Sequence, residues 1–182
     1  IVFLTPAAAA VGQQHKVVEA KDGSGIPGYK DTPVQPWSGF HVHDPDRPAP
    51  PVVDPGKPAS QTTAGTAPSD AVILFDGSEL SAWKPAGWEL KDGCMVATGG
   101  LLQSRQEFGD CQLHVEWCVP EKLEENSWNQ GNNGVELLGG IEVQIFDSQR
   151  VKLYPDGQAA SIYAQTPPLV NACREPGQWQ TY

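Results

Sequence analysis

The chain has 182 residues and a mass of 19.6 kDa, a length typical of one domain rather than two. Its 22 acidic and 12 basic residues give a formal net charge of −10, which argues against nucleic acid or an anionic membrane surface as a partner. No apolar run approaches the roughly 18 residues that a membrane span requires, so we expect no membrane-spanning segment.

The first ten residues are apolar and end in a run of alanines. This pattern is typical of the end of a secretory signal peptide, and we predict that residues 1–10 are its remnant, although an apolar terminus without a function has the same composition. A signal peptide implies a periplasmic or secreted bacterial protein. At the other end, residues 177–182 resemble a turn entering a strand that has barely begun, so we interpret the chain as a fragment at both ends.

Residues 11–70 form a leader and linker rich in Pro, Gly and Ser, and 11 of the 17 prolines lie in residues 1–70. We expect disorder or an extended tether for most of this segment, because it holds too few large apolar residues to bury a core. Two stretches, 28–33 and 37–43, could instead wrap on the neighbouring domain. His41 and His43 have the spacing of a metal half-site on a strand, but two solvated histidines are the favoured interpretation.

From residue 71 the sequence changes to short β-type runs separated by turn signals, and five of the six tryptophans lie here. Such spacing of strands, with no helical stripe, predicts an all-β sandwich or barrel. Asp92-Gly93 and Gly139-Gly140 mark two hairpin turns. The predicted strands are 72–75, 88–90, 94–97, 101–104, 111–117, 134–138 and 141–145.

Several reaction classes and metal sites lack their sequence signatures. No G-x-S-x-G, P-loop or H-E-x-x-H motif occurs, so a serine hydrolase, an NTPase and a zincin are not supported. The cysteines lack C-x-x-C spacing, which excludes a zinc ribbon and leaves disulfides and buried free thiols as alternatives. The four cysteines are Cys94, Cys111, Cys118 and Cys173.

The most informative stretch is residues 141–148, with the sequence IEVQIFDS. The two-residue period of a strand places Glu142 and Gln144 on the face opposite its apolar residues. That polar face is either an ordinary solvated face or the floor of a ligand groove. Paired carboxylates across a groove suit general acid–base chemistry on sugars. Polar side chains of the same kind occur on other predicted strands, at His114, Glu116 and Glu136.

Two loops complete the candidate site. Trp128 and the polar segment 129–134 offer an aromatic face for a sugar ring and amides for its hydroxyls, although Asn-Gly is also ordinary turn chemistry. The second loop, 156–168, is long and mixes small and polar residues. Arg174 follows it and either anchors a carboxylate or forms a surface ion pair.

Taken in order, these motifs resemble the 3-keto-disaccharide hydrolase family over residues 72–182. Residues 28–53 are similar, more weakly, to leaders of exported bacterial members. The matching segments are LFDGSELSAW (74–83), FGDCQLHVEW (108–117), NNGV (132–135), EVQIFDS (142–148), GQAASIYAQTPP (157–168) and GQWQTY (177–182).

The resemblance implies a concanavalin A-like jelly-roll sandwich, of which residues 71–182 are the N-terminal part, C-terminally truncated and preceded by a mostly irregular leader. We therefore expect the fragment alone to be inactive and poorly stable. The implied activity is hydrolysis of 3-keto-glycosides, or their 1,2-elimination followed by hydration, with a small-molecule sugar as substrate. The cofactor requirement and the oligomeric state are left open; Glu142, Asp147 and carbonyls could hold Ca²⁺, but no Asp-rich loop demands it.

Carried onto this chain, the resemblance makes Glu142, Gln144 and Asp147 the catalytic candidates. Glu142 would be a base or an acid, Gln144 a donor to a hydroxyl or an enolate, and Asp147 a partner or a structural anchor. The alternative functions are a non-catalytic carbohydrate-binding module on the same scaffold and a structural domain without a ligand. The substrate-binding candidates are Asn133, Tyr163, Arg174, His114 and Trp128.

Overall fold

The computed structural model of the chain describes residues 2–4, 14–54, 67–122 and 129–182. Within these ranges the regular elements are β-strands, apart from one short 3₁₀ turn, η1 (Pro155–Gly157). The predicted all-β fold class is therefore confirmed. No helix among the described residues has the length and apolar character needed to cross a membrane.

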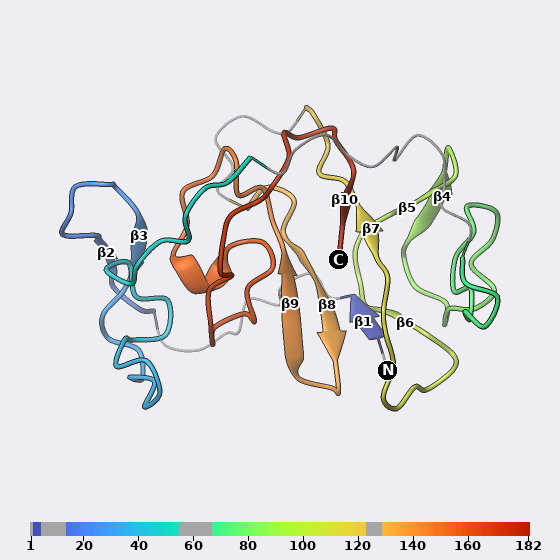
Figure 1. Cartoon of the computed structure of the whole chain (residues 1–182), viewed down its shortest axis with the longest axis horizontal. Coiled ribbons are helices and arrows are strands. Elements are labelled where there is room, and N and C mark those ends of the chain that lie inside the picture. Colours follow the sequence, from blue (N-terminus) through green and yellow to red (C-terminus); the bar gives the residue numbers. More distant parts are fainter. Residues whose placement is uncertain (1, 5–13, 55–66, 123–128) are drawn as a thin grey trace.

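A four-stranded antiparallel sheet lies at the centre of the molecule (Figure 1). Its strands, in spatial order, are β6 (Leu102–Gln103), β1 (Val2–Leu4), β8 (Asn133–Leu137) and β9 (Ile141–Ile145). The backbone of β1, which belongs to the predicted signal-peptide remnant, pairs with both β6 and β8. Strands from distant parts of the sequence thus meet in this sheet.

Both predicted hairpins are present. β4 (Glu89–Lys91) pairs with β5 (Cys94–Val96), and the intervening Asp92 and Gly93 have φ values of 50° and 75°, as a tight two-residue turn requires. β8 pairs with β9, with Glu136 opposite Glu142. The turn signals therefore located the two hairpins correctly.

Two further predicted strands differ from the structure. Segment 111–117 is reduced to β7 (Glu116–Trp117), which pairs with β10 (Gln180–Thr181). Segment 72–75 forms no strand, and the prediction was wrong there. Its Leu74 carbonyl instead accepts a hydrogen bond from the indole of Trp83 at 2.8 Å, so this backbone anchors a core side chain rather than a ladder.

The hydrophobic core belongs to the part of the chain after residue 71, as composition indicated. It packs the inner face of β8 and β9 against tryptophans from neighbouring segments. All four cysteines are free, and burial raises the pKa of the core residue Cys173 to about 11. The largest apolar members of the core are Trp83, Leu102, Trp117, Val135, Ile145, Phe146 and Leu153.

Residues 14–54, which we call the leader, are folded against the β domain, so disorder, the favoured interpretation, was wrong for them. The alternative given for 28–33 and 37–43 is the one observed, because Tyr29 and His43 contact Tyr154 of the β domain. β2 (Val17–Glu19) and β3 (Pro27–Tyr29) form a hairpin, and the rest of the leader is irregular. Buried polar groups take the place of an apolar core: the Lys30 ammonium lies 2.6 Å from the buried carboxylate of Asp44 and 2.8 Å from Asp46. Paired charges can be buried where single ones cannot.

Candidate functional site

The polar face of the β8–β9 hairpin is buried rather than solvated. Gln144 is only 1% exposed and Glu142 is half-buried, so the interpretation as an ordinary solvated face was wrong. Glu142 lies directly over Gly134, where a methyl group would come within 2.0 Å of the Glu142 Oε1 atom. The absence of a side chain at Gly134 thus makes room for the carboxylate.

The segment 160–163 extends the sheet along the outer edge of β9. Gln144 N donates to Ser161 O at 3.0 Å, and Ala160 N donates to Gln144 O at 2.8 Å. Tyr163 N donates to Glu142 O at 2.9 Å, which fixes Tyr163 next to Glu142. The resemblance-based candidates Glu142 and Tyr163 are therefore neighbours in space although 21 positions separate them in the sequence.

The Glu142 carboxyl group lies in an unusual electrostatic environment. Its buried Oε1 has no hydrogen-bond partner among the described residues. Burial, and secondarily the Glu136 carboxylate opposite on β8, raises the pKa of Glu142. A carboxylate that is poorly solvated and unpartnered accepts a proton more readily than one in water. Such perturbed groups in half-buried sites are candidates for acid–base catalysis.

Tyr163 adjoins this carboxyl group, and Tyr154 in turn adjoins Tyr163. The hydroxyls of Tyr154 and Tyr163 are hydrogen-bonded to each other at 3.0 Å. Burial raises the pKa of both phenols, and for Tyr163 the charge of Glu142 raises it further. Both phenols consequently stay protonated at neutral pH. They supply O–H donors suited to a carbonyl or enolate oxygen.

The leader contributes a histidine to the same group of side chains. The ring centroid of His43 lies 4.0 Å from that of Tyr154 and 5.0 Å from that of Tyr163. Its Nδ1 lies 3.3 Å from Oδ1 of Asp156, a fully buried residue of η1. The His43 side chain is 14% exposed, so the interpretation as a solvated histidine was wrong. Figure 1 shows the leader beside η1 and its following loop.

Sequence reasoning missed Tyr154 and Asp156 and misjudged His43. The H-x-H pair was the one available signal for His43, but it carried no indication of a partner 113 positions away. Asp156 opens the loop 156–168, which was noted for its length and its mixture of small and polar residues, and Tyr154 lies just before that loop. Without the fold, nothing in their local sequence distinguishes them from ordinary turn residues.

The remaining polar members of the 141–148 stretch have structural contacts. Gln144 Nε2 donates to Asn132 Oδ1 at 3.2 Å, and its buried Oε1 has no partner among the described residues. Asp147 Oδ2 is 2.6 Å from Arg150 Nε, and its Oδ1 accepts the Arg150 N–H at 3.1 Å. Asp147 was predicted to be either a catalytic partner or a structural anchor, and these contacts are those of a residue that anchors a turn.

The structure does not gather the other predicted residues around Glu142. His114 forms an exposed pair with Glu116, with 3.2 Å between Nε2 and Oε1. Asn133 Oδ1 accepts the N–H of Gly134 at 2.8 Å, and the N–H of Arg174 donates to Gln180 Oε1 at 3.1 Å. Trp128 lies outside the described residues.

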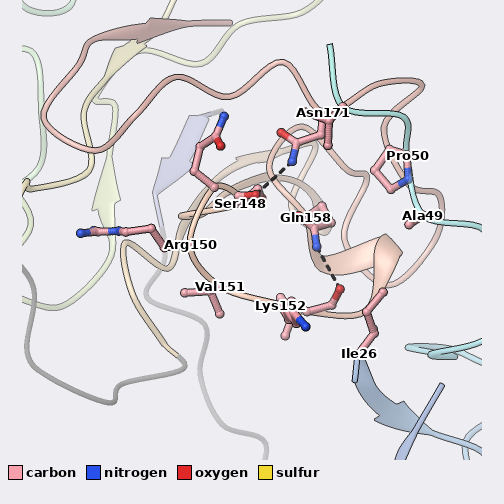
Figure 2. Close-up of a pocket in the computed structure, with 12 residues that line it drawn as sticks. Ile26, Ala49, Pro50, Ser148, Arg150, Val151, Lys152, Gln158 and Asn171 are labelled. Atoms are coloured by element: carbon pink, nitrogen blue, oxygen red, sulfur yellow. Dashed lines mark hydrogen bonds between the residues drawn. The ribbon is translucent and has the colours of Figure 1, made fainter. Parts of the chain in front are cut away.

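A pocket of about 260 Å³ lies where the leader meets the β domain (Figure 2). Its lining does not include Glu142, Gln144 or Tyr163. Figure 2 shows its amides turned to backbone carbonyls: Asn171 Nδ2 donates to Ser148 O at 3.0 Å and Gln158 Nε2 to Leu153 O at 2.9 Å. Both of these bonds lie within the β domain, whereas backbone bonds join the leader to it: Val53 N donates to Asn171 O at 3.0 Å and Asn171 N to Pro51 O at 2.8 Å. Among the described residues, no group of three or more His, Cys, Asp or Glu is placed to hold a metal ion.

Gly134→Ala is expected to disable the candidate site without unfolding the domain. The new methyl group would displace the Glu142 carboxylate, but the displaced atoms are the end of a flexible side chain. We expect a loss of activity approaching that of a Glu142 substitution, together with a small decrease in melting temperature. Gly140→Ala is the matched control, because nothing lies within 4 Å of the methyl group it would add. Equal activities of the two variants would contradict the placement of Glu142.

Comparisons with known proteins agree on one relationship. A sequence model described as the 3-keto-alpha-glucoside-1,2-lyase-like domain matches residues 70–182. The crystal structure of a candidate glycosyl hydrolase from Parabacteroides distasonis ATCC 8503 is 44% identical to the chain, with a TM-score of 0.60. The match covers 64% of this chain and 52% of that one, so this chain spans about half the length of that protein. No curated protein matches the sequence.

Proposed function

The chain belongs to the family of 3-keto-alpha-glucoside-1,2-lyase-like domains, and on this premise we propose that it is part of an enzyme that cleaves 3-keto-glycosides by general acid–base chemistry. The concanavalin-like fold of this family agrees with the observed all-β architecture. The observation that carries the proposal is the half-buried carboxyl group of Glu142, which has a raised pKa and an unpartnered oxygen beside two protonated phenols.

The chemistry of a 3-keto sugar suits such a carboxylate. The ketone at C3 acidifies the hydrogen on C2, and a base can remove this proton to leave an enolate. Collapse of the enolate expels the substituent at C1, whose oxygen takes up a proton, and the product is a 2-hydroxyglucal. Addition of water across its double bond, with hydroxyl to C1 and a proton to C2, completes a net hydrolysis.

We assign the first step to Glu142, which removes the C2 proton. Its poor solvation makes the ionised carboxylate a stronger base than an exposed one. One phenol of the Tyr154–Tyr163 pair donates its O–H to the other, and the remaining O–H of the pair donates a hydrogen bond to the C3 oxygen as negative charge develops on it, the type of stabilisation that commonly dominates such steps. Gln144 lies two residues after Glu142 on the same face of β9 and is hydrogen-bonded to Asn132. Its side chain would contact a sugar hydroxyl.

Two substrates that differ at one carbon, each incubated with the full-length protein, test this proposal. A 4-nitrophenyl 3-keto-glucoside is expected to release nitrophenol, whereas the matching glucoside with a hydroxyl at C3 is expected to release none, because its C2 hydrogen is not acidic. Release is followed by absorbance, and the sugar product by mass spectrometry. Equal turnover of both compounds would indicate an ordinary glycosidase. Binding of both compounds without release of nitrophenol from either would indicate a carbohydrate-binding module.

A further inference from the structure

The leader lies outside the region that the family model matches, yet it lines the candidate site. The match begins at residue 70, whereas His43 and Tyr29 come from residues 14–54. The Tyr29 ring centroid is 6.3 Å from that of His43 and 6.4 Å from that of Tyr154. Leader aromatics and domain tyrosines thus form one contiguous group that reaches Glu142 through Tyr163.

Asp156 holds the imidazole of His43 in a defined orientation. Its Oδ1 faces His43 Nδ1 at 3.3 Å, and its Oδ2 accepts the backbone N–H of His43 at 3.0 Å. The Arg47 guanidinium, also buried, lies 3.5 Å from Oδ2. A buried carboxylate on Nδ1 leaves Nε2 as the nitrogen that can exchange a proton, which is the usual arrangement of a proton-transferring histidine. Among the described residues, Nε2 has no hydrogen-bond partner.

Attachment of the leader does not by itself account for an imidazole at position 43. The backbone N–H of His43 and the Arg47 side chain already bind Asp156, and a residue without a ring, such as asparagine, would offer the same N–H. The neighbouring His41 is a useful contrast, because its ring bonds the Thr32 carbonyl within the leader. The ring of His43 instead contacts both domain tyrosines, Tyr154 and Tyr163.

We propose that the leader completes the active site and that His43, oriented by Asp156, is its second proton-transfer group. This inference rests on the proposed function. Glu142 takes the proton from C2, and protonated His43 gives its Nε2 proton to the oxygen that leaves C1 as the C1–O bond breaks. In the hydration step His43 takes a proton from the attacking water, whose oxygen bonds to C1, while Glu142 returns its proton to C2. Both groups then regain their starting states.

The dependence on the leaving group tests this role. A nitrophenolate leaves without protonation, whereas an alkoxide does not. His43→Ala is therefore expected to lower kcat about 100-fold on methyl 3-keto-glucoside and less than about tenfold on the 4-nitrophenyl compound, with similar KM values. Added imidazole should restore part of the lost activity on the methyl compound. His43→Gln, which keeps the size and polarity of the ring, should show the same selectivity if His43→Ala folds poorly.

The control is Lys21→Ala, which removes a leader side chain that is 86% exposed and whose ammonium lies 3.6 Å from Asp46 Oδ2; it should leave both rates unchanged. Equal losses on the two substrates, no rescue by imidazole and a lowered melting temperature would show that His43 only holds the leader in place and would overturn the assignment. All of these rates are measured in the full-length protein; absence of turnover by that protein, unaltered, would instead contradict the proposed function, and the inference with it.

Discussion

Glu142→Gln is expected to lower kcat on a 3-keto-glucoside about 1000-fold and to leave KM nearly unchanged, because an amide of the same shape fills the site but cannot accept a proton. The structure places this carboxyl group over Gly134 with one oxygen buried and unpartnered, so the amide can occupy the same space. Steady-state kinetics on the 4-nitrophenyl substrate measures the effect. A variant with wild-type kcat would remove Glu142 from the mechanism.

The stability of Glu142→Gln should depend on pH differently from that of the wild type. Because the pKa of Glu142 is raised in the folded state, folding favours its protonated form. The stability associated with this group is present at acidic pH and is lost as the pH rises through the raised pKa. Melting temperatures of the wild type should therefore fall over that range more than those of Glu142→Gln. At neutral pH the variant should be at least as stable as the wild type.

Glu136→Gln is the matched control for this experiment. It removes the carboxylate opposite Glu142, which contributes to the raised pKa, and leaves Glu142 itself in place. Turnover should persist, and the acidic limb of the pH–rate profile should shift to lower pH. A profile that does not move would show that Glu142 is not the group that titrates in it.

Asp156→Ala is expected to destabilise the protein by about 3–5 kcal/mol, the usual result of removing one partner from a buried ionic group. The substitution leaves the buried Arg47 guanidinium without its carboxylate and the backbone N–H of His43 without its acceptor. Chemical denaturation measures the loss, and limited proteolysis should show cleavage within the leader before the β domain is cut. Turnover should fall as well, because the leader carries His43.

The control for Asp156→Ala is Asp31→Ala. Asp31 is an exposed leader carboxylate that binds His15 and the backbone of Lys16, and exposed pairs contribute little to stability. Its removal should change neither the proteolysis pattern nor the unfolding curve appreciably. If the two variants unfold alike, Asp156 does not anchor the leader.

Sequence patterns a few residues long predicted correctly the elements whose interactions are between residues close in the sequence. The Asp92-Gly93 turn and the β8–β9 hairpin were predictable because positive φ angles and alternating side chains are encoded within a few residues. Alternation also placed Glu142 and Gln144 on one face. It could not show that this face is buried, since the segment 160–163 and the leader that adjoin it come from elsewhere in the chain.

The leader was misjudged because composition measures only the capacity to form an apolar core. Its order depends instead on paired charges such as Lys30 with Asp44, and on a contact between His43 and Asp156 that no local pattern reveals. Asp147 was assigned from a motif match, but its carboxylate is occupied by Arg150 three residues later. Two residues named from the resemblance, Tyr163 and Glu142, are neighbours in the structure, and no local pattern indicated that contact.

The contact between His43 and Asp156 joins residues 113 positions apart, and this separation has a consequence for the order of folding. Closing so long a loop is entropically costly before the partners exist, whereas the β8–β9 hairpin needs only neighbouring residues. The hairpin and its core should therefore form first, and the leader should dock afterwards. In amide hydrogen exchange during refolding, the N–H groups of β9 should then become protected early and the N–H of His43 late. The β domain would thus be compact before the leader brings His43 into the proposed active site.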